Sequence, residues 1–171
     1  MKIYFLLFFL LIFSFSCKSR EYIELRHKNH QKLNNDEISI KISPLKNSDS
    51  AIVKIFQFEK IIKKKNENSK ISYVKKNTKN IITIENYRDI IKNFNTIKEQ
   101  DLKWPRTGKD STGMAYILFI GFDGGNNSLI YRKGSFLKKF NVLGMSDLYG
   151  SFYSTTKLIS ESGGLKLEKI D

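Results

Sequence analysis

The sequence predicts an α+β fold, in which an antiparallel β-sheet of about six to eight strands is packed by two amphipathic helices. Several segments alternate apolar and polar residues as half-buried strands do, and short polar turns separate them. Two other segments carry apolar residues at helical spacing. Strands and helices do not alternate in the order that builds parallel sheets, and 171 residues suit one domain.

The first part of the chain is typical of an export signal. Lys2 is followed by eleven apolar residues at positions 3–13, and the uncharged stretch ends at Lys18. A membrane-spanning helix needs about 20 apolar residues, so this segment is too short for a permanent anchor. We therefore expect it to start translocation and then to be removed.

Residues 14–17, Ser-Phe-Ser-Cys, end this segment and contain the only cysteine, Cys17. They resemble the lipobox of bacterial lipoproteins, in which a lipidated cysteine becomes the first residue of the mature protein. The resemblance implies a signal peptide over 1–16 and acyl chains, such as palmitate, on Cys17. Because Lys18 is not the Asp that retains such proteins at the inner membrane of enteric bacteria, the resemblance implies the outer membrane. The alternative is a secreted protein cut nearby.

The mature chain divides into a tether and a domain. Residues 17–35 are polar and weakly periodic, which predicts a tether behind the lipidated cysteine. Residues 36–171 are predicted to form a single α+β domain. In general appearance the chain resembles small envelope lipoproteins of Gram-negative bacteria.

Four strands open the predicted domain. The first alternates strictly and ends at Pro44, and the second is apolar on both faces, which predicts a central position. Polar, lysine-rich turns are expected at 63–68 and 75–79. The four strands are predicted at 37–43, 51–59, 70–75 and 80–85.

Two helices are predicted in the second half. The clearest covers 86–99, with Asn86 as its N-cap and apolar residues at helical spacing behind it. The other begins after Ser146 and is stopped by Gly163 and Gly164.

The remaining segments are predicted to be strands and one loop. A loop runs from Trp104 to Gly113, and a hairpin turn is expected at 123–126. The strands are predicted at 114–122, 127–133 and 135–143, with a short last strand from Leu165.

Catalysis has little support in the sequence. His27 and His30 are the only histidines and fall in the predicted tether, so the predicted domain has none for acid–base or nucleophilic chemistry. Asp110 and Asp123 fall in predicted loops, but sequence spacing does not show the facing pair that a carboxylate hydrolase needs. One cysteine excludes an intrachain disulfide and multi-cysteine metal sites. We therefore expect a non-enzymatic protein with no metal and no cofactor.

The formal net charge is +13, and residues 17–80 hold 16 basic and 7 acidic residues, a net charge of +9. This charge favours contact with anionic lipid or an anionic envelope polymer. Two alternatives that involve no partner are favoured: codon bias, since Lys far outnumbers Arg, and lysines that block aggregation at strand edges. The candidate basic residues are Lys60, Lys63, Lys64, Lys65, Lys75, Lys76 and Lys79.

A second candidate surface is the loop that begins at Trp104. Trp104, Arg106 and Lys109 lie among flexible glycines, and Trp and Arg are favoured anchors in binding sites. The alternative is that Trp104 packs under the end of the preceding helix. No nucleic-acid partner is expected for an exported protein.

The function predicted from these observations is a lipid-anchored cell-envelope protein with a non-catalytic binding or accessory role. Three alternatives stay open. They are an immunity-type inhibitor of a secreted toxin, a module that binds an envelope polymer or anionic lipid and, least favoured, a carboxylate-based hydrolase.

Overall fold

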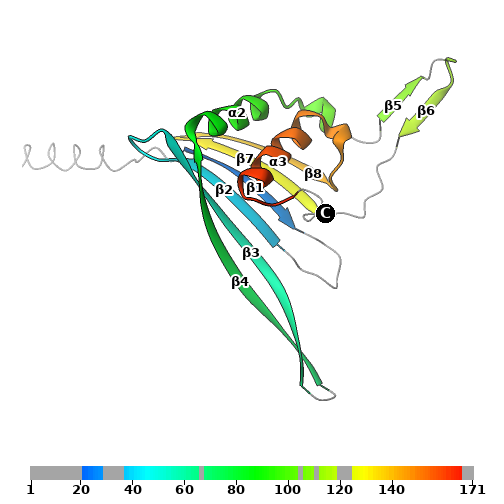
Figure 1. Ribbon diagram of the computed structural model, residues 1–171. Helices are drawn as coiled ribbons and strands as arrows, with labels where there is room; N and C mark the ends of the chain where they lie inside the picture. Colours follow the sequence, from blue (N-terminus) through cyan, green and yellow to red (C-terminus); the bar gives the residue numbers. More distant parts are fainter. Residues whose placement is uncertain are drawn as a thin grey trace, which may run out of the picture.

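A six-stranded antiparallel sheet forms the centre of the structure, a computed structural model that describes residues 21–28, 37–65, 68–103, 106–109, 112–118 and 125–166. For residues 59–74, 106–109 and 116–118 the description covers the backbone. The strands lie in the order β4-β3-β2-β1-β7-β8, and each neighbouring pair is antiparallel (Figure 1). They are β1 (Glu21–Lys28), β2 (Glu37–Pro44), β3 (Ser50–Lys65), β4 (Asn68–Thr83), β7 (Asn126–Lys133) and β8 (Phe136–Leu143).

Two α-helices pack on this sheet, so the predicted α+β class is confirmed (Figure 1). The helical segments are α2 (Ile84–Asn95), α3 (Ser151–Ser162) and the short 3-10 turns η1 (Glu99–Leu102) and η2 (Asp147–Tyr149). A separate two-stranded antiparallel sheet pairs β5 (Arg106–Lys109) with β6 (Ala115–Leu118).

The core lies between the sheet and the two helices. Alternate residues of the central strands are fully buried there, including Ile23 and Leu25 of β1. Phe94 of α2 is also fully buried, and its ring centroid lies 5.7 Å from that of Tyr131 and 5.3 Å from that of Phe140. Because burying one such side chain contributes about 1.5–3 kcal/mol, this layer is the main source of stability.

The strand β1 overturns the predicted tether. It lies between β2 and β7, with Leu25 opposite Ile40 on one side and Leu129 on the other. The prediction of a polar tether over 17–35 is therefore wrong for residues 21–28, and the domain includes the chain from Glu21 onward. The reason is tertiary: a strand in the middle of a sheet gains backbone hydrogen bonds on both edges and buries its apolar face.

The edge strand β4 is continuous where the sequence predicts two strands. Its 16 residues pair with β3 throughout, so the predicted turn at 75–79 is wrong; Lys79, for example, lies opposite Lys54. An edge strand can carry polar side chains on both faces, which explains why this segment resembles a turn.

The predicted hairpin of 114–122 with 127–133 is also wrong. The described part of the first segment, β6, pairs with β5, and β7 pairs with β1 and β8. The predicted loop after Trp104 therefore contains a strand. The last strand, predicted from Leu165, falls mainly outside the described residues, and Leu165 itself is not in a strand.

The N-cap of α2 lies three residues earlier than the sequence predicts. Thr83 is the cap, because its Oγ1 accepts a hydrogen bond from the backbone N–H of Asn86 at 3.2 Å. The predicted apolar stripe is confirmed: Tyr87, Ile90 and Phe94 are buried against the sheet.

The second predicted helix is divided. Ser146 is an N-cap as predicted, but it caps η2, accepting a hydrogen bond from the N–H of Leu148 at 3.2 Å. Gly150 then adopts a φ of +56° and joins η2 to α3. Gly163 is the C-cap of α3, and Gly164 follows with a φ of +71°, as expected for glycines that end a helix.

Candidate functional site: the open face of the sheet

The face of the six-stranded sheet that lies opposite the helices is the candidate site. Strand residues alternate between the two faces, and in the described chain α2 and α3 both pack on the face that carries Ile23 and Leu25. We call the other face the open face. Its residues are Tyr22, Glu24, Arg26 and Lys28 (β1), Glu37, Ser39, Lys41 and Ser43 (β2), Ile52, Lys54, Phe56 and Phe58 (β3), Lys75, Asn77, Lys79 and Ile81 (β4), Asn126, Ser128, Ile130 and Arg132 (β7), and Leu137, Lys139, Asn141 and Leu143 (β8).

The open face is strongly basic. Eight of its side chains are Lys or Arg and two are Glu, so its formal charge is +6. Cations on all six strands contribute, which spreads the positive potential over the whole surface.

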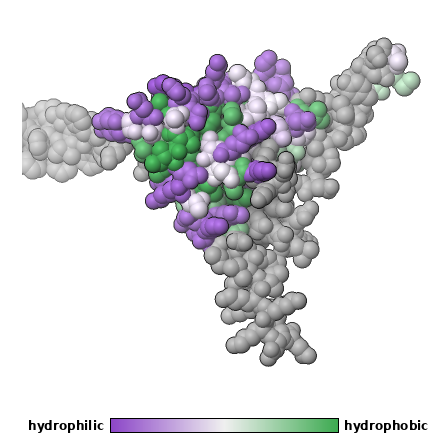
Figure 2. All heavy atoms as spheres, in the orientation of Figure 1, coloured by the Kyte–Doolittle hydropathy of each residue, from purple (hydrophilic) through white to green (hydrophobic). Residues whose placement is uncertain are grey.

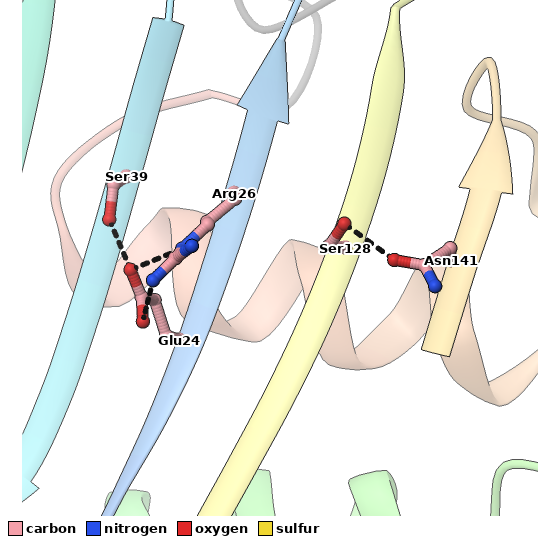
Figure 3. A network of polar contacts seen from close by, with 5 residues as sticks. All are labelled: Glu24, Arg26, Ser39, Ser128 and Asn141. Carbon is pink, nitrogen blue, oxygen red and sulfur yellow. Dashed lines mark hydrogen bonds and ion pairs between the residues drawn. The ribbon is translucent and has the colours of Figure 1, made fainter. Parts of the chain in front are cut away.

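A buried carboxylate stands at the centre of the open face. Glu24 is 6% exposed, and its two oxygens accept hydrogen bonds from Arg26, from Nε at 2.7 Å and from Nη2 at 3.1 Å (Figure 3). The hydroxyl of Ser39 donates to the same carboxylate at 2.8 Å. This bond with Glu24 raises the pKa of Arg26 further above its ordinary value. The network fixes a guanidinium that is 53% exposed, so it is pre-positioned for a further acceptor.

Aromatic rings lie beside cations on the same face. The Nζ of Lys41 lies 3.6 Å from the ring centroid of Tyr22, and the Nζ of Lys75 lies 5.4 Å from that of Phe56. Each ring holds its lysine in place and offers flat apolar area next to a charge. Phe58 continues this area and is 37% exposed.

These groups line a shallow hollow of about 480 Å³. Its walls come from β1, β2, β3 and β4, so residues distant in the sequence are brought together by the strand order. The lining residues are Tyr22, Glu24, Arg26, Glu37, Ser39, Lys41, Ser43, Lys54, Phe56, Phe58 and Lys75.

A second buried polar group lies on the helix side and fastens β1 to β7. His27, 3% exposed, pairs with Asn127, whose Oδ1 lies 2.8 Å from the Nδ1 of the histidine. The amide Nδ2 of Asn127 donates to the carbonyl of Gly144 at 2.9 Å, so Oδ1 is the acceptor and Nδ1 carries the proton. The sequence prediction that the domain has no histidine is thus wrong, because β1 brings His27 into it.

The predicted lysine cluster is divided by the structure. Lys75 and Lys79 belong to the open face, whereas Lys76 lies on the opposite face of β4 and lines a hollow with Gly163 of the α3 end. Lys60, Lys63, Lys64 and Lys65 continue β3, with Lys63 opposite Lys70 of β4.

The second predicted surface falls largely outside the described residues. Trp104 and Asp110 lie there, as do Cys17 and Asp123. The backbone of Arg106 and Lys109 forms the two ends of β5. The candidate roles of these residues therefore stay predictions.

The described residues hold no group of three or more His, Cys, Asp or Glu side chains that could bind a metal ion. A helix long and apolar enough to cross a bilayer is likewise absent from the described ranges.

The sequence alone does not reveal most of the site, because residues 21–28 resemble a polar tether. A signal was present: within residues 21–28, Ile23, Leu25 and His27 alternate with Glu24 and Arg26. A histidine at the third inward position hides that period of two, since His is only intermediate in its tendency to be buried.

Comparison of the chain with protein-family models, with curated proteins and with solved structures found no match.

Proposed function

We propose that this protein is a non-catalytic binding protein of the cell envelope, held on a membrane through lipid on Cys17, that binds an acidic partner protein with the open face. The observation that carries the proposal is the open face itself: a surface of formal charge +6 with a guanidinium fixed by Glu24 and Ser39 and aromatic rings beside it.

The size of the open face suits a protein partner. Six strands at a spacing of about 4.8 Å give a width of about 24 Å, and eight-residue strands give a height of about 23 Å, or roughly 550 Å² in projection. Side-chain relief raises the accessible area further. The face is therefore comparable with one side of a standard protein interface, about 800 Å².

The chemistry of the open face favours an acidic protein over a second copy or an anionic polymer. Two copies of a face with charge +6 repel each other. A bare polyanion leaves the exposed Phe58 and Leu143 without apolar contacts, whereas a protein can cover them. Arginine and aromatic residues are also the usual anchors of protein interfaces.

The carboxylate in the hollow suits positioning rather than catalysis. Both oxygens of Glu24 accept hydrogen bonds from Arg26, and Ser39 donates a further one. A general acid or base needs a carboxyl free to exchange a proton with substrate, and here the acceptor positions hold Arg26 in place.

A defined polyanion, poly-L-glutamate, tests which face binds acidic groups. The open-face variant Lys41→Glu/Lys54→Glu and the control Lys92→Glu/Lys157→Glu on the exposed sides of α2 and α3 change the net charge equally. We expect the open-face variant to lose at least about tenfold in affinity and the control less than about twofold. Equal losses would mean that net charge alone governs binding and would overturn the proposal.

The nature of the partner is tested by capture from envelope extracts with the full-length protein. An acidic protein retained by the wild type and the helix-side control, and lost with the open-face variant, supports the proposal. Capture of an anionic polymer in place of a protein would overturn the protein assignment.

A further inference from the structure

The start of β1 fixes how close the domain lies to the proposed lipid anchor. Four peptide units separate Cys17 from Glu21, so the Cα atoms of these residues are at most about 14 Å apart. A tether extending to residue 35 would allow a separation several times as large. The inference rests on the proposed lipidation of Cys17.

Glu21 is held firmly at its end of the sheet. The hydroxyls of Tyr87 and Tyr131 donate to its Oε1 at 3.2 and 3.1 Å, and the Nζ of Lys133 lies 3.4 Å from its Oε2. The point at which the chain enters the domain is therefore fixed to α2 and β7, and an anchor close to it constrains the orientation of the whole domain.

The same end of the sheet carries two turns. Strand register places the β2–β3 turn and the β7–β8 turn level with the start of β1, since Glu21 lies opposite Lys133. The end of β4 and the start of α2 lie there too (Figure 1). We call Glu21 and residues 44–50, 81–88 and 132–137 the anchor end.

Exposed apolar side chains gather at the anchor end. Leu45 is 37% exposed, Ile81 71%, Phe136 54% and Leu137 60%, and these are four of the eight exposed large hydrophobic residues in the described chain. Figure 2 shows a hydrophobic area bordered by hydrophilic side chains where Figure 1 places the starts of β3 and α2. Apolar side chains spread along one end of a sheet suit contact with a lipid interface, because there they leave water together.

The charge at the anchor end is nearly balanced. It holds four cations and three carboxylates, a formal charge of +1. A contact between this end and lipid would therefore rely on apolar side chains and would not need anionic headgroups. The four cations are Lys46, Arg88, Arg132 and Lys133, and the three carboxylates are Glu21, Asp49 and Glu85.

We propose that the anchor end rests on the bilayer that holds the lipidated Cys17, with Leu45, Ile81, Phe136 and Leu137 at the lipid interface. The sheet then stands upright, and its open face is reachable from the side. β3 and β4, each 16 residues or about 50 Å long, extend away from the membrane, so the backbone at the far end of β3 is distant from it.

The test uses two leucines of β8 that differ in their distance from the anchor end. Leu137 and Leu143 both lie on the open face, are 60% and 50% exposed, and are about 20 Å apart along the strand. With Cys17 lipidated, Leu137→Cys and Leu143→Cys each supply one free thiol for a nitroxide label in the full-length protein. The labelled proteins are reconstituted into phosphatidylcholine vesicles, and fatty-acid labelling of each preparation is measured.

We expect the label at position 137 to be accessible to oxygen dissolved in lipid and at least about threefold less accessible to a water-soluble relaxation agent than the label at 143. If the protein is labelled with fatty acid but the labels at 137 and 143 are equally accessible to the water-soluble agent, the orientation is overturned and the anchor stands. If the protein with Cys17 takes up no more fatty acid than the Cys17→Ser variant, the anchor is overturned, and the orientation with it.

Discussion

Replacing Asn127 by Ala tests whether β1 lies in the middle of the sheet. The side chain of Asn127 is 1% exposed and bonds His27 of β1 as well as the carbonyl of Gly144 after β8. In Asn127→Ala the Nδ1–H of His27 and the oxygen of Gly144 lose these partners. The carbonyl of Gly125 also accepts a hydrogen bond from Asn127. It is not orphaned in the variant, because the backbone N–H of Gly144 still donates to it at 2.9 Å.

The expected cost follows from these two orphaned groups. A buried donor or acceptor left without a partner costs about 1–3 kcal/mol, so the variant should lose about 4 kcal/mol of unfolding free energy. For a domain of this size that corresponds to a fall in Tm of about 8–16 °C. Asn77→Ala, an exposed change on the edge strand β4, should stay within about 0.5 kcal/mol of the wild type.

Urea denaturation followed by circular dichroism gives these free energies. A double-mutant cycle of Asn127→Ala with His27→Ala should show a coupling of about 0.5–3 kcal/mol, because the two side chains share one hydrogen bond. If Asn127→Ala matches Asn77→Ala, the residues from Glu21 to Lys28 do not pair with β7, and the open face as described does not exist.

Three further predictions concern single groups. Burial, reinforced by the charge of Glu21, raises the pKa of Tyr131 to about 12. The protonated hydroxyl of Tyr131 therefore contributes fully to the unfolding free energy below pH 10, and this contribution is lost as the pH rises to 12. In Tyr131→Phe, urea denaturation should show a smaller fall in unfolding free energy between pH 10 and pH 12. Arg26→Ala, measured in the same assay, should cost about 2 kcal/mol because it leaves a buried carboxylate on Glu24, and Glu24→Gln should recover part of that cost. Thr83→Ala should lower the Tm through loss of about 1 kcal/mol at the start of α2, and Asn86→Ala should not; the reverse result would restore Asn86 as the cap.

The fold class and most element positions could be predicted because their signals are local. Three isoleucines alternating in 37–43 face the core as expected, and the stripe of α2 is set by residues three and four apart. The helix α3 ends at glycines as predicted, because the positive φ that Gly164 adopts is unfavourable for most other residues. None of these predictions depends on which strand pairs with which.

The pairing of strands could not be predicted, and the site depends on it. The residues that line the hollow around Glu24 come from four strands. Lys41 and Phe56 lie near Glu24 only because of the register in which β2 pairs with β1 and β3 pairs with β2. The polar stretch from Lys75 to Lys79 reads as a turn until the edge position of β4 is known. Polar residues on a strand carry the same local pattern as polar residues in a loop.

Lysine footprinting tests the central claim, that the open face is covered by a partner in the native envelope, most directly. Full-length protein is modified with an amine-reactive reagent in native envelopes and, after purification, in detergent, and the reactivity of each lysine is compared by mass spectrometry. We predict that Lys41 and Lys54 react less in envelopes than when purified, while Lys92 and Lys157 on the helices react equally in both. Equal reactivity of Lys41 and Lys54 in the two states, or protection confined to Lys92 and Lys157, would contradict the claim.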